Sequence, residues 1–389
     1  MSLHNLVIAR CLQLAILVLI TAGSGSSAGQ GSTDRSSDTP TPTGSADPKG
    51  CIPSGDETAI NAALSGLGAK ASLCPRAIFE ISRTIKLSAD GQELTTAGPV
   101  AEADRAVIRL ANSDLSTAIF SRSSDIFIHD LIVDGARPQF GRMTNGSALI
   151  ELGGKVKGVR VDHIHAYDPR GWSVLHVYEG SLQCTGARIT NSVLGPAGHP
   201  DGEWADGISF ACRNGLVSQN TIVDASDGAI VLFGAPGTVV EGNLIKTENN
   251  QLLGGINLVD YGPFDGDYSG TVVRHNRIVA DKGFIKVGIA VGPAVWGSNK
   301  GQVNRNGVVV DNMISGNHIG FGIAVDGVTG FTITGNKVLG RPGGQRGPRC
   351  IKGQSPPGKA LIRNPETTQG NFQDGFETGS LLYSICIVP

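Results

Sequence analysis

The sequence predicts an all-β fold, a parallel β-helix solenoid that opens with one short capping helix. Of the 389 residues, 55 are glycine, about twice the ordinary share. Hydrophobic residues make up 40% of the chain and charged residues only 17%, so a large core can be buried. From Ile78 onward almost no helical periodicity remains, and a short unit of strand, polar residue and strand recurs instead.

Composition and charge exclude several classes of protein. The formal net charge is -2, which gives no basic surface for a nucleic-acid partner. The glycines lack the three-residue period of collagen. The sequence contains no phosphate-binding glycine loop, nucleophile elbow or zinc-ligand spacing.

The N-terminus has the pattern of a secretion signal over residues 1–28. One arginine precedes the apolar run Leu12–Ile20, and Ser26-Ser27-Ala28 matches a small-residue cleavage site. The run is shorter than the roughly 20 residues that a membrane-spanning helix needs, although an uncleaved anchor is the alternative. We therefore expect a secreted, extracellular protein without membrane contact after cleavage, in which a Ser/Thr/Pro-rich linker follows over residues 29–50.

The cysteines support export. Of the seven, Cys11 lies inside the signal, and six remain. Their clustering favours three local disulfides, Cys51–Cys74, Cys184–Cys212 and Cys350–Cys386, with free buried thiols as the alternative. Asn145 begins an Asn-Gly-Ser sequon, which the same route would allow to be glycosylated.

One short amphipathic helix is expected over Asp56–Leu67, where Ile60, Ala63, Leu64 and Leu67 recur at helical spacing. A repeat follows, in which a β-branched strand leads to a polar anchor and then to a glycine-led strand. The anchors are His163, Asn191, Asn220, Asn243, Asn276, Asn312 and Asn336. The 23 residues from Asn220 to Asn243 suit one coil of a solenoid, whose stacked asparagine amides would have a structural role.

With these features the chain resembles the right-handed parallel β-helix proteins of the pectin-lyase-like superfamily. The resemblance covers roughly residues 51–345 and includes the stretch Asp56–Leu64, which looks like an N-terminal cap. It implies a single-stranded right-handed solenoid over 51–345, followed by a C-terminal cap or tail over 346–389. The superfamily holds hydrolases, lyases, epimerases and inert spikes, so the fold alone selects no function.

Two aspartates precede glycine-led strands, Asp206 before Gly207 and Asp227 before Gly228. Aligning the repeats on these glycines predicts one column of residues, namely Arg170, Asp206, Asp227, Gly254, Lys282 and Ile319. Stacked strands lie about 4.8 Å apart, so the two carboxylates would repel and their pKa values would separate, as a general acid and base require. The alternative is that both Asp-Gly pairs are ordinary turns.

The same stretches resemble part of the polygalacturonase pattern. Trp204-Ala205-Asp206-Gly207 stands for its Asn-Thr-Asp, Ser226-Asp227-Gly228 for its Asp-Asp, and Phe284-Ile285-Lys286 for its Arg-Ile-Lys. The resemblance implies that Asp206 and Asp227 are catalytic and that Lys286 contacts the substrate. The chain departs from the pattern because Gly228 replaces the second aspartate, Phe284 replaces the arginine and the Gly-His-Gly motif is missing.

A second candidate site is Tyr167-Asp168-Pro169-Arg170, which resembles the Asp-Pro-His stretch of mannuronan C5-epimerases with Arg170 in place of the histidine. A uronate lyase or epimerase needs a cation against the substrate carboxylate, a base and an acid. Arg170 or Lys286, together with Tyr167, Asp168 and His176, could supply them.

Two acidic and aromatic segments, 199–204 and 260–268, suit a sugar-binding surface, because sugar rings stack on flat side chains. The candidate substrate-binding residues here and beside them are His199, Trp204, Asn257, Asp260 and Tyr261. No cofactor is required, and Asp265-Gly266-Asp267 leaves calcium open as a ligand.

The sequence thus predicts a secreted monomeric enzyme that cleaves glycosidic bonds of a polysaccharide, with hydrolysis favoured. Uronate lyase or C5-epimerase activity is one alternative. A non-catalytic cell-wall-binding or adhesion solenoid is the other.

Overall fold

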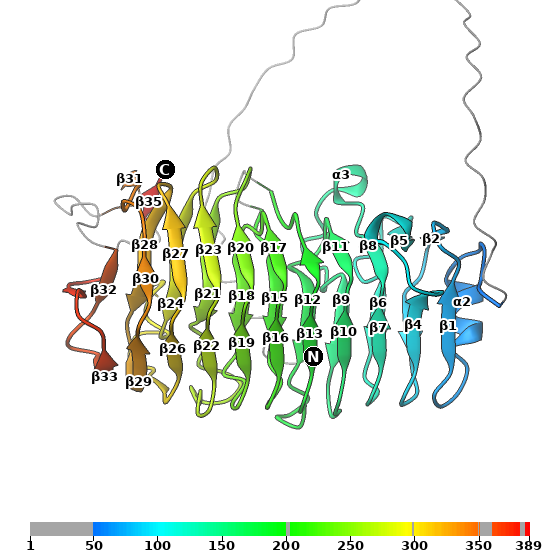
Figure 1. The fold of residues 1–389 in the computed structure, drawn as a ribbon, viewed down its shortest axis with the longest axis horizontal. Coiled ribbons are helices and arrows are strands. Elements are labelled where there is room, and N and C mark those ends of the chain that lie inside the picture. The colour runs from blue at the N-terminus through cyan, green and yellow to red at the C-terminus, as the bar shows by residue number, and fades with distance from the viewer. Residues whose placement is uncertain (1–49, 200–202, 298, 349, 351–359, 382–385) are drawn as a thin grey trace, which may run out of the picture. The chain divides into compact units, whose positions relative to one another are not determined.

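The computed structural model describes residues 50–199, 203–297, 299–348, 350, 360–381 and 386–389, and these form a right-handed parallel β-helix (Figure 1). Each coil contributes one strand to each of three parallel sheets. The predicted signal peptide and all but the last residue of the predicted linker lie outside the described residues. Within the described segments, no helix has the length and apolar character needed to cross a membrane.

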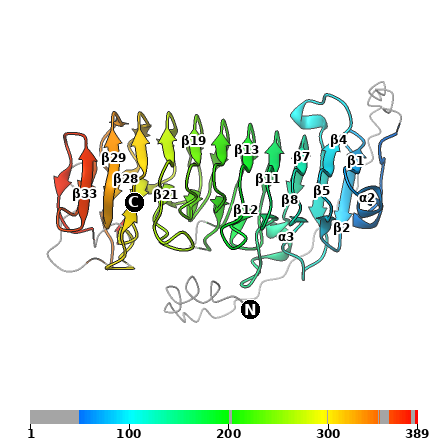
Figure 2. The same cartoon turned by 90° about the horizontal axis from the view of Figure 1, so that it is seen from below.

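Sheet A stacks its strands along the axis of the solenoid (Figure 2). Its members in order are β1 (Lys70–Leu73), β4 (Glu93–Thr96), β7 (Phe127–His129), β10 (Arg160–Asp162), β13 (Arg188–Thr190), β16 (Leu216–Ser218), β19 (Val239–Glu241), β22 (Val272–Arg274), β26 (Val308–Val310) and β29 (Val328–Thr334), and β29 also pairs with β25 (Asn304–Arg305) and β33 (Thr368–Phe372).

Sheet B follows sheet A in each coil, after a turn of one or two residues from β7 onward. It contains β2 (Ile78–Ile81), β5 (Ala106–Leu110), β8 (Leu131–Asp134), β11 (His165–Tyr167), β14 (Val193–Leu194), β17 (Thr221–Val223), β20 (Leu244–Lys246), β23 (Arg277–Ala280), β27 (Met313–Gly316) and β30 (Lys337–Val338).

Sheet C completes each coil. It contains β3 (Ile85–Leu87), β6 (Ile119–Ser121), β9 (Ile150–Gly153), β12 (Ser173–Tyr178), β15 (Asp206–Phe210), β18 (Gly228–Leu232), β21 (Leu252–Leu258), β24 (Ile285–Val291), β28 (Ile319–Val325), β32 (Leu361–Arg363) and β34 (Glu377–Thr378). The short strands β31 (Gln345–Arg346) and β35 (Ile387–Val388) form a separate antiparallel pair.

The core is the space that the three sheets enclose. In the coil of β16, β17 and β18, Val217, Ile222 and Ile230 are fully buried and point inward from the three sheets. Such three-residue strands bury little surface alone, so each coil is stable only against its neighbours. This is why the sequence repeats an apolar pattern rather than one long amphipathic element.

The predicted asparagine ladder is confirmed from Asn220 onward. The side-chain Nδ2 of each asparagine donates to the Oδ1 of the next, at 3.0 Å for Asn220 to Asn243 and 2.9 Å for Asn243 to Asn276. The series continues at 2.9 Å through Asn312 to Asn336. Each asparagine therefore satisfies buried backbone and side-chain groups at the turn between sheets A and B.

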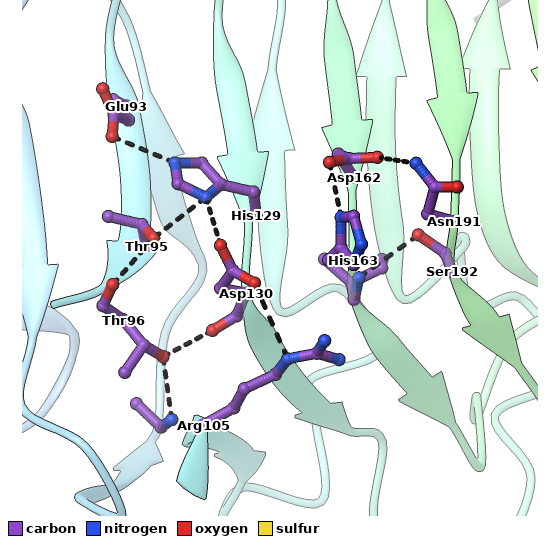
Figure 3. Close-up of polar contacts among 12 residues, drawn as sticks. Glu93, Thr95, Thr96, Arg105, His129, Asp130, Asp162, His163, Asn191 and Ser192 are labelled. Carbon is purple, nitrogen blue, oxygen red and sulfur yellow. Dashed lines mark hydrogen bonds and ion pairs between the residues drawn. The ribbon is translucent and has the colours of Figure 1, made fainter. Parts of the chain in front are cut away.

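The first two predicted ladder positions, His163 and Asn191, are wrong by one residue. Ser192 occupies the ladder position, since its backbone N–H donates to Asn220 Oδ1 at 3.1 Å. Asn191 instead takes the left-handed turn conformation before it and donates to Asp162 Oδ1 at 2.8 Å (Figure 3). His163 occupies the same turn position one coil earlier, and its Nδ1 lies 2.6 Å from Asp162 Oδ2. In the Asn191-Ser192 turn both positions are polar, which made the sequence ambiguous there.

The ends of the solenoid differ from the prediction. The capping helix α2 covers Glu57–Ala63, with Asp56 accepting the Thr58 N–H at 2.8 Å, and it stops before the left-handed Gly66. Leu67, predicted on its apolar face, is 82% exposed. At the other end, β32, β33 and β34 extend sheets C and A, so the predicted β-helix boundary at residue 345 is too early.

Two further short helices, η2 (Glu102–Asp104) and α3 (Arg137–Phe140), lie in turns. All three predicted disulfides, Cys51–Cys74, Cys184–Cys212 and Cys350–Cys386, are present. Disulfides persist in oxidising compartments, which fits the predicted export.

Candidate active site

Three rows of side chains run across the coils on or beside the outer face of sheet C. In β15, Ile208 and Phe210 belong to the core, so Ser209 between them faces outward. A Cβ on Gly207 would meet the core residue Ile222 at 2.7 Å, so Gly207 points inward and Asp206 outward. The two outward residues of this strand define two of the rows.

The register fixes the members of each row. The Asp206 row contains Ser173, Asp206, Gly228, Gly254, Val287 and Phe321. The Ser209 row contains Phe120, Glu151, His176, Ser209, Val231, Asn257, Ala290 and Ala324. The residues immediately before the Asp206 row form the Asp227 row, which contains Trp172, Ala205, Asp227, Leu253 and Lys286.

The predicted column through Asp206 is therefore wrong in most of its members. In the register, Asp206 pairs with Ser173 of β12 and not with Arg170. On the next coil the row continues with Gly228 of β18 and not with Asp227. Neither Lys282 nor Ile319 belongs to this row. Alignment on the Asp-Gly dipeptides shifted the register by one residue, because β15 begins at its aspartate whereas β18 begins at the glycine.

Asp206 and Asp227 nevertheless interact, and Asp260 joins them. Burial, together with the Asp227 and Asp260 carboxylates, raises the pKa of Asp206 well above its ordinary value. Burial raises the pKa of Asp227 to about 6. Burial and the Asp227 charge raise the pKa of Asp260 to about 7. Three carboxylates from neighbouring coils thus form one electrostatic group, which we call the aspartate group.

The backbone holds the first two aspartates in place. The N–H of Asp206 donates to the Trp172 carbonyl at 2.8 Å, and that of Asp227 donates to the Ala205 carbonyl at 3.2 Å. The Asp206 carboxylate accepts the Gly228 N–H and the Ser209 hydroxyl, each at 2.8 Å. These two hydrogen bonds favour the ionised form and oppose the effect of burial on the pKa.

Gly228 is required where the polygalacturonase pattern has its second aspartate. A Cβ at this position would lie 3.1 Å from Asp206 Oδ1 and 2.8 Å from Asn257 Nδ2, with Val231 closer still. No larger side chain fits there without displacing these neighbours. Asp260 supplies a third carboxylate from the loop after β21 instead.

The loop that carries Asp260 is fixed by Tyr268. This tyrosine is fully buried, and its hydroxyl lies within hydrogen-bond distance of the carbonyls of Leu232, at 2.8 Å, and Asp260, at 3.1 Å. Tyr261, which follows Asp260, is half-buried, and its carbonyl accepts the Gly266 N–H at 2.6 Å. The loop therefore presents Asp260 from a defined backbone position.

Asn257 completes this part of the face. It is only 4% exposed, and in the described part of the chain its side-chain oxygen has no hydrogen-bond partner. A Cβ on Gly228 or on Gly254 would touch its amide group, so the amide lies over the gap that these two glycines leave. A ligand hydroxyl would reach this buried oxygen beside the aspartate group only after the amide moves.

An aromatic and ionic cluster adjoins the aspartate group toward the N-terminal coils. The His176 ring lies 4.8 Å from the Trp172 ring, 6.2 Å from Tyr178 and 6.5 Å from Phe233, measured between centroids. Its Nδ1 lies 3.0 Å from a Glu151 carboxylate oxygen. Burial alone would raise the pKa of Glu151, but hydrogen bonds from His176 and Arg122 lower it.

The second predicted site lies elsewhere. Tyr167 is on the outer face of sheet B, opposite Asp134 in the register. Burial and the Asp134 charge raise the pKa of Tyr167. Asp168 follows in a left-handed conformation, and burial together with the Asp134 charge raises its pKa to about 6, against the effect of Arg137.

Arg170 is engaged inside the fold. It is 3% exposed, and its guanidinium donates to four backbone carbonyls, those of Asn112, Leu115, Phe140 and Gly141. These bonds attach the loop after β5 and the segment around α3 to the coil of β12. Arg170 thus has a structural role, and it does not lie in the aspartate group.

The remaining predicted residues are divided among several places. His199 is exposed at the start of an insertion, where its N–H donates to the Glu203 carbonyl at 3.0 Å, and Trp204 is half-buried beside it. Lys286 is 8% exposed and lies in the Asp227 row, two coils beyond Asp227. Asn145, the predicted glycosylation site, is exposed.

The calcium site that the sequence left open gains no support from a ligand cluster. Asp267 caps a turn by accepting the Ser269 N–H at 2.9 Å, and Asp265 is exposed. Over the described ranges, no group of three or more His, Cys, Asp and Glu side chains is arranged to hold a metal ion.

Several residues of this face were not predicted, namely Glu151, Trp172, Ser173, Ser209 and Phe233. Each lies on a strand of sheet C or directly beside one, at a position that only the correct register reveals. Asp260 was predicted to bind substrate, and the structure places it in the aspartate group. A register anchored on Ile208, Ile230 and Ile256 would have found these residues.

The central coils match a family model described as a right handed beta helix region over residues 176–338. No curated protein matches the chain. The structure is similar to an alginate lyase from Paenibacillus sp. str. FPU-7, with 15% identity, a TM-score of 0.50 and coverage of 74% of this chain and 97% of that one. The family match and this likeness show the fold class, a right-handed parallel β-helix.

Two further solved structures have lower TM-scores. The A-module of a mannuronan C-5 epimerase from Azotobacter vinelandii is 15% identical, with a TM-score of 0.44 and coverage of 73% and 90%. A DFA-IIIase from Arthrobacter chlorophenolicus A6 is 12% identical, with a TM-score of 0.49 and coverage of 83% and 88%.

Proposed function

We propose that this protein is a carbohydrate-active enzyme that hydrolyses glycosidic bonds, with Asp206, Asp227 and Asp260 as its acid–base carboxylates. The observation that carries the proposal is the aspartate group, in which three carboxylates share one partly buried position and all have raised pKa values. Such a group keeps a proton near neutral pH while still carrying negative charge, and glycoside hydrolysis needs both forms.

The reaction uses the two forms in turn. A protonated carboxyl gives its proton to the glycosidic oxygen as the bond to the anomeric carbon breaks. An ionised carboxylate takes a proton from the attacking water, or stabilises the positive charge that develops on the sugar. Because the three groups interact, the apparent pKa values belong to the group and not to single residues.

A carbohydrate substrate also fits the surroundings of the aspartate group. Trp172, His176 and Phe233 present ring surfaces beside it, and sugars stack on such rings. Asn257 has an unsatisfied oxygen, which a sugar hydroxyl would reach only after the buried amide turns outward. The similar alginate lyase acts on a polysaccharide by its name, which supports the substrate class by analogy of fold alone.

A uronate lyase or C5-epimerase is the second candidate, because Lys286 lies in the same row as Asp227 and could face a substrate carboxylate. Two observations weigh against it. A raised pKa makes Tyr167 a weaker source of a basic phenolate at neutral pH, and Arg170 is committed to backbone carbonyls. A purely adhesive solenoid would have no reason to maintain buried carboxylates that repel each other.

A panel of neutral and uronate polysaccharides tests the proposal. New reducing ends without ultraviolet absorbance are expected, whereas an unsaturated uronate product would identify a lyase. Lys286→Ala should retain substantial rate and Asp227→Asn should not, and the reverse result would favour the lyase. If the protein releases no sugar from any member of a broad panel but binds one of them, the adhesive alternative stands.

A further inference from the structure

The outer face of sheet C changes character between β21 and β24. Up to β21, the Asp206 and Ser209 rows carry mainly polar residues and glycine, and their apolar members are Phe120 and Val231. From β24 on, the same rows carry Val287, Ala290, Phe321 and Ala324, of which none is more than 1% exposed. These residues form a hydrophobic cluster separate from the core of the solenoid.

The C-terminal segment covers this cluster. Leu381 and Ile387 pack on it and are 2% and 1% exposed. Ile387 belongs to β35, which pairs with β31 beside the last coils (Figure 1), and Cys386 is linked to Cys350. Val295, from the loop after β24, is buried in the same cluster. The cover is thus tied down by strand pairing, a disulfide and apolar contacts.

The face remains accessible on the opposite side of the aspartate group. His176, Tyr178 and Phe120 are half-buried on β12 and β6, and Lys86 on β3 is exposed. Arg122 lies 5.3 Å from the Tyr178 ring and 4.6 Å from the Phe120 ring, and its Nη2 lies 2.8 Å from Glu151. Ring faces and polar groups therefore continue over several coils in this direction only.

We propose that a sugar chain binds along this face and approaches the aspartate group from the side of the N-terminal coils. The adjoining binding subsite consists of Trp172, His176, Tyr178 and Phe233. The covered hydrophobic cluster at β24 prevents the chain from extending further in the other direction. The proposal rests on the proposed hydrolysis and specifies its substrate and cleavage mode. The aspartate group lies at the boundary of the cover, so only a short end of the chain fits beyond the cleaved bond. The enzyme therefore releases small sugars from chain ends and does not cut long chains internally.

The time course of product sizes tests this with the wild-type protein. On whichever polysaccharide of the panel is hydrolysed, size-exclusion chromatography should show small sugars from the first minutes while the polymer peak keeps its size. A rapid fall in polymer size, with fragments of many lengths, would contradict the proposal that the chain binds from one side only. It would not contradict the proposed hydrolytic function. Failure to hydrolyse any glycan would overturn both.

A substitution tests the subsite separately. Trp172→Ala should raise KM about three- to tenfold on long substrates with little change in kcat, because it removes a stacking surface and no acid or base. Phe127→Ala is the control, since Phe127 is a half-buried ring on the outer face of sheet A. Equal effects of the two substitutions on KM would contradict the subsite.

Discussion

The Asp206 carboxylate accepts a 2.8 Å hydrogen bond from the backbone N–H of Gly228, the residue that directly follows Asp227. This bond crosses from one coil to the next and brings the side chain of one aspartate to the backbone beside the other. The register of β15 and β18 therefore fixes the backbones of the two aspartates next to each other. Such fixed geometry is what an acid–base pair requires.

Substitution of either aspartate should remove most activity without unfolding the protein. Asp206→Asn and Asp227→Asn should each lower turnover about 10²- to 10⁴-fold, and the double variant should be little worse, because the residues act as a unit. Asparagine keeps the acceptor oxygen for Gly228 and removes a carboxylate whose ionisation burial opposes, so the melting temperature near neutral pH should not fall.

The control for this comparison is Asp265→Asn, at an exposed turn of the loop after β21. It should leave the rate unchanged. If both active-site variants kept more than about a tenth of the wild-type rate, we would abandon the carboxylate assignment and regard these aspartates as turn residues.

Removal of Asp260 should shift the pH dependence of catalysis. The Asp260 charge helps to raise the pKa of Asp206, so in Asp260→Asn the aspartate group should lose its last catalytic proton at lower pH. The alkaline limb of the kcat profile should move down by roughly half a unit to one unit. An Asp260→Asn enzyme with an unchanged profile would remove Asp260 from the group.

The same substitution should stabilise the fold at high pH. The folded pKa of Asp260, about 7, exceeds its ordinary value of 3.8, so the folded state binds the proton more tightly than the unfolded state. Stability is therefore lost as pH rises from about 4 to about 7. Asp260→Asn avoids this loss and should be more stable than wild type at pH 8, by up to about 4 kcal/mol, with little difference at pH 4.

Thermal melting of both proteins across this pH range measures the effect. Asp224→Asn is a suitable contrast, because the buried Asp224 carboxylate accepts several hydrogen bonds, including the Asn249 N–H at 2.9 Å, and should lose stability at pH 8. Melting curves of Asp260→Asn and wild type that stay parallel from pH 4 to pH 8 would show that Asp260 does not resist ionisation.

The asparagine ladder should contribute to the stability of the fold and not to catalysis. Asn243→Ala removes hydrogen bonds to Asn276 and to the Val217 carbonyl and leaves the buried Asn220 N–H without its acceptor. The expected cost is about 2 kcal/mol, seen as a lower melting temperature with an unchanged specific activity. Asn191→Ala, at an exposed left-handed position outside the ladder, should cost only about 1 kcal/mol, because alanine tolerates that conformation less well than asparagine. Equal losses would contradict the distinction between the two asparagines.

The sequence predicted the fold well because each coil of a solenoid is formed by residues that are close together in the sequence. Each coil repeats the same turn asparagine and inward aliphatic residues, so the spacing from Asn220 to Asn243 already gives the length of a coil. The disulfides followed for the same reason, since each joins cysteines that are near in sequence, such as Cys184 and Cys212 at a separation of 28.

The candidate site was predicted only in part because it depends on register. A shift of one residue exchanges the face on which a side chain lies, and the Asp-Gly dipeptides at 206 and 227 concealed such a shift. Arg170 was misread because its partners around Phe140 lie on another coil and in an inserted segment. The effect of Asp260 on Asp206 likewise joins a loop to a strand two coils away.

Isotope incorporation tests the central claim most directly. The wild-type protein is incubated in H2(18)O with the glycan that it cleaves, and the products are analysed by mass spectrometry. We expect one 18O atom to be incorporated for each glycosidic bond that is broken. Asp227→Asn should form almost none of these products. Products without 18O that are lighter by one water and absorb in the ultraviolet would contradict hydrolysis by the aspartate group.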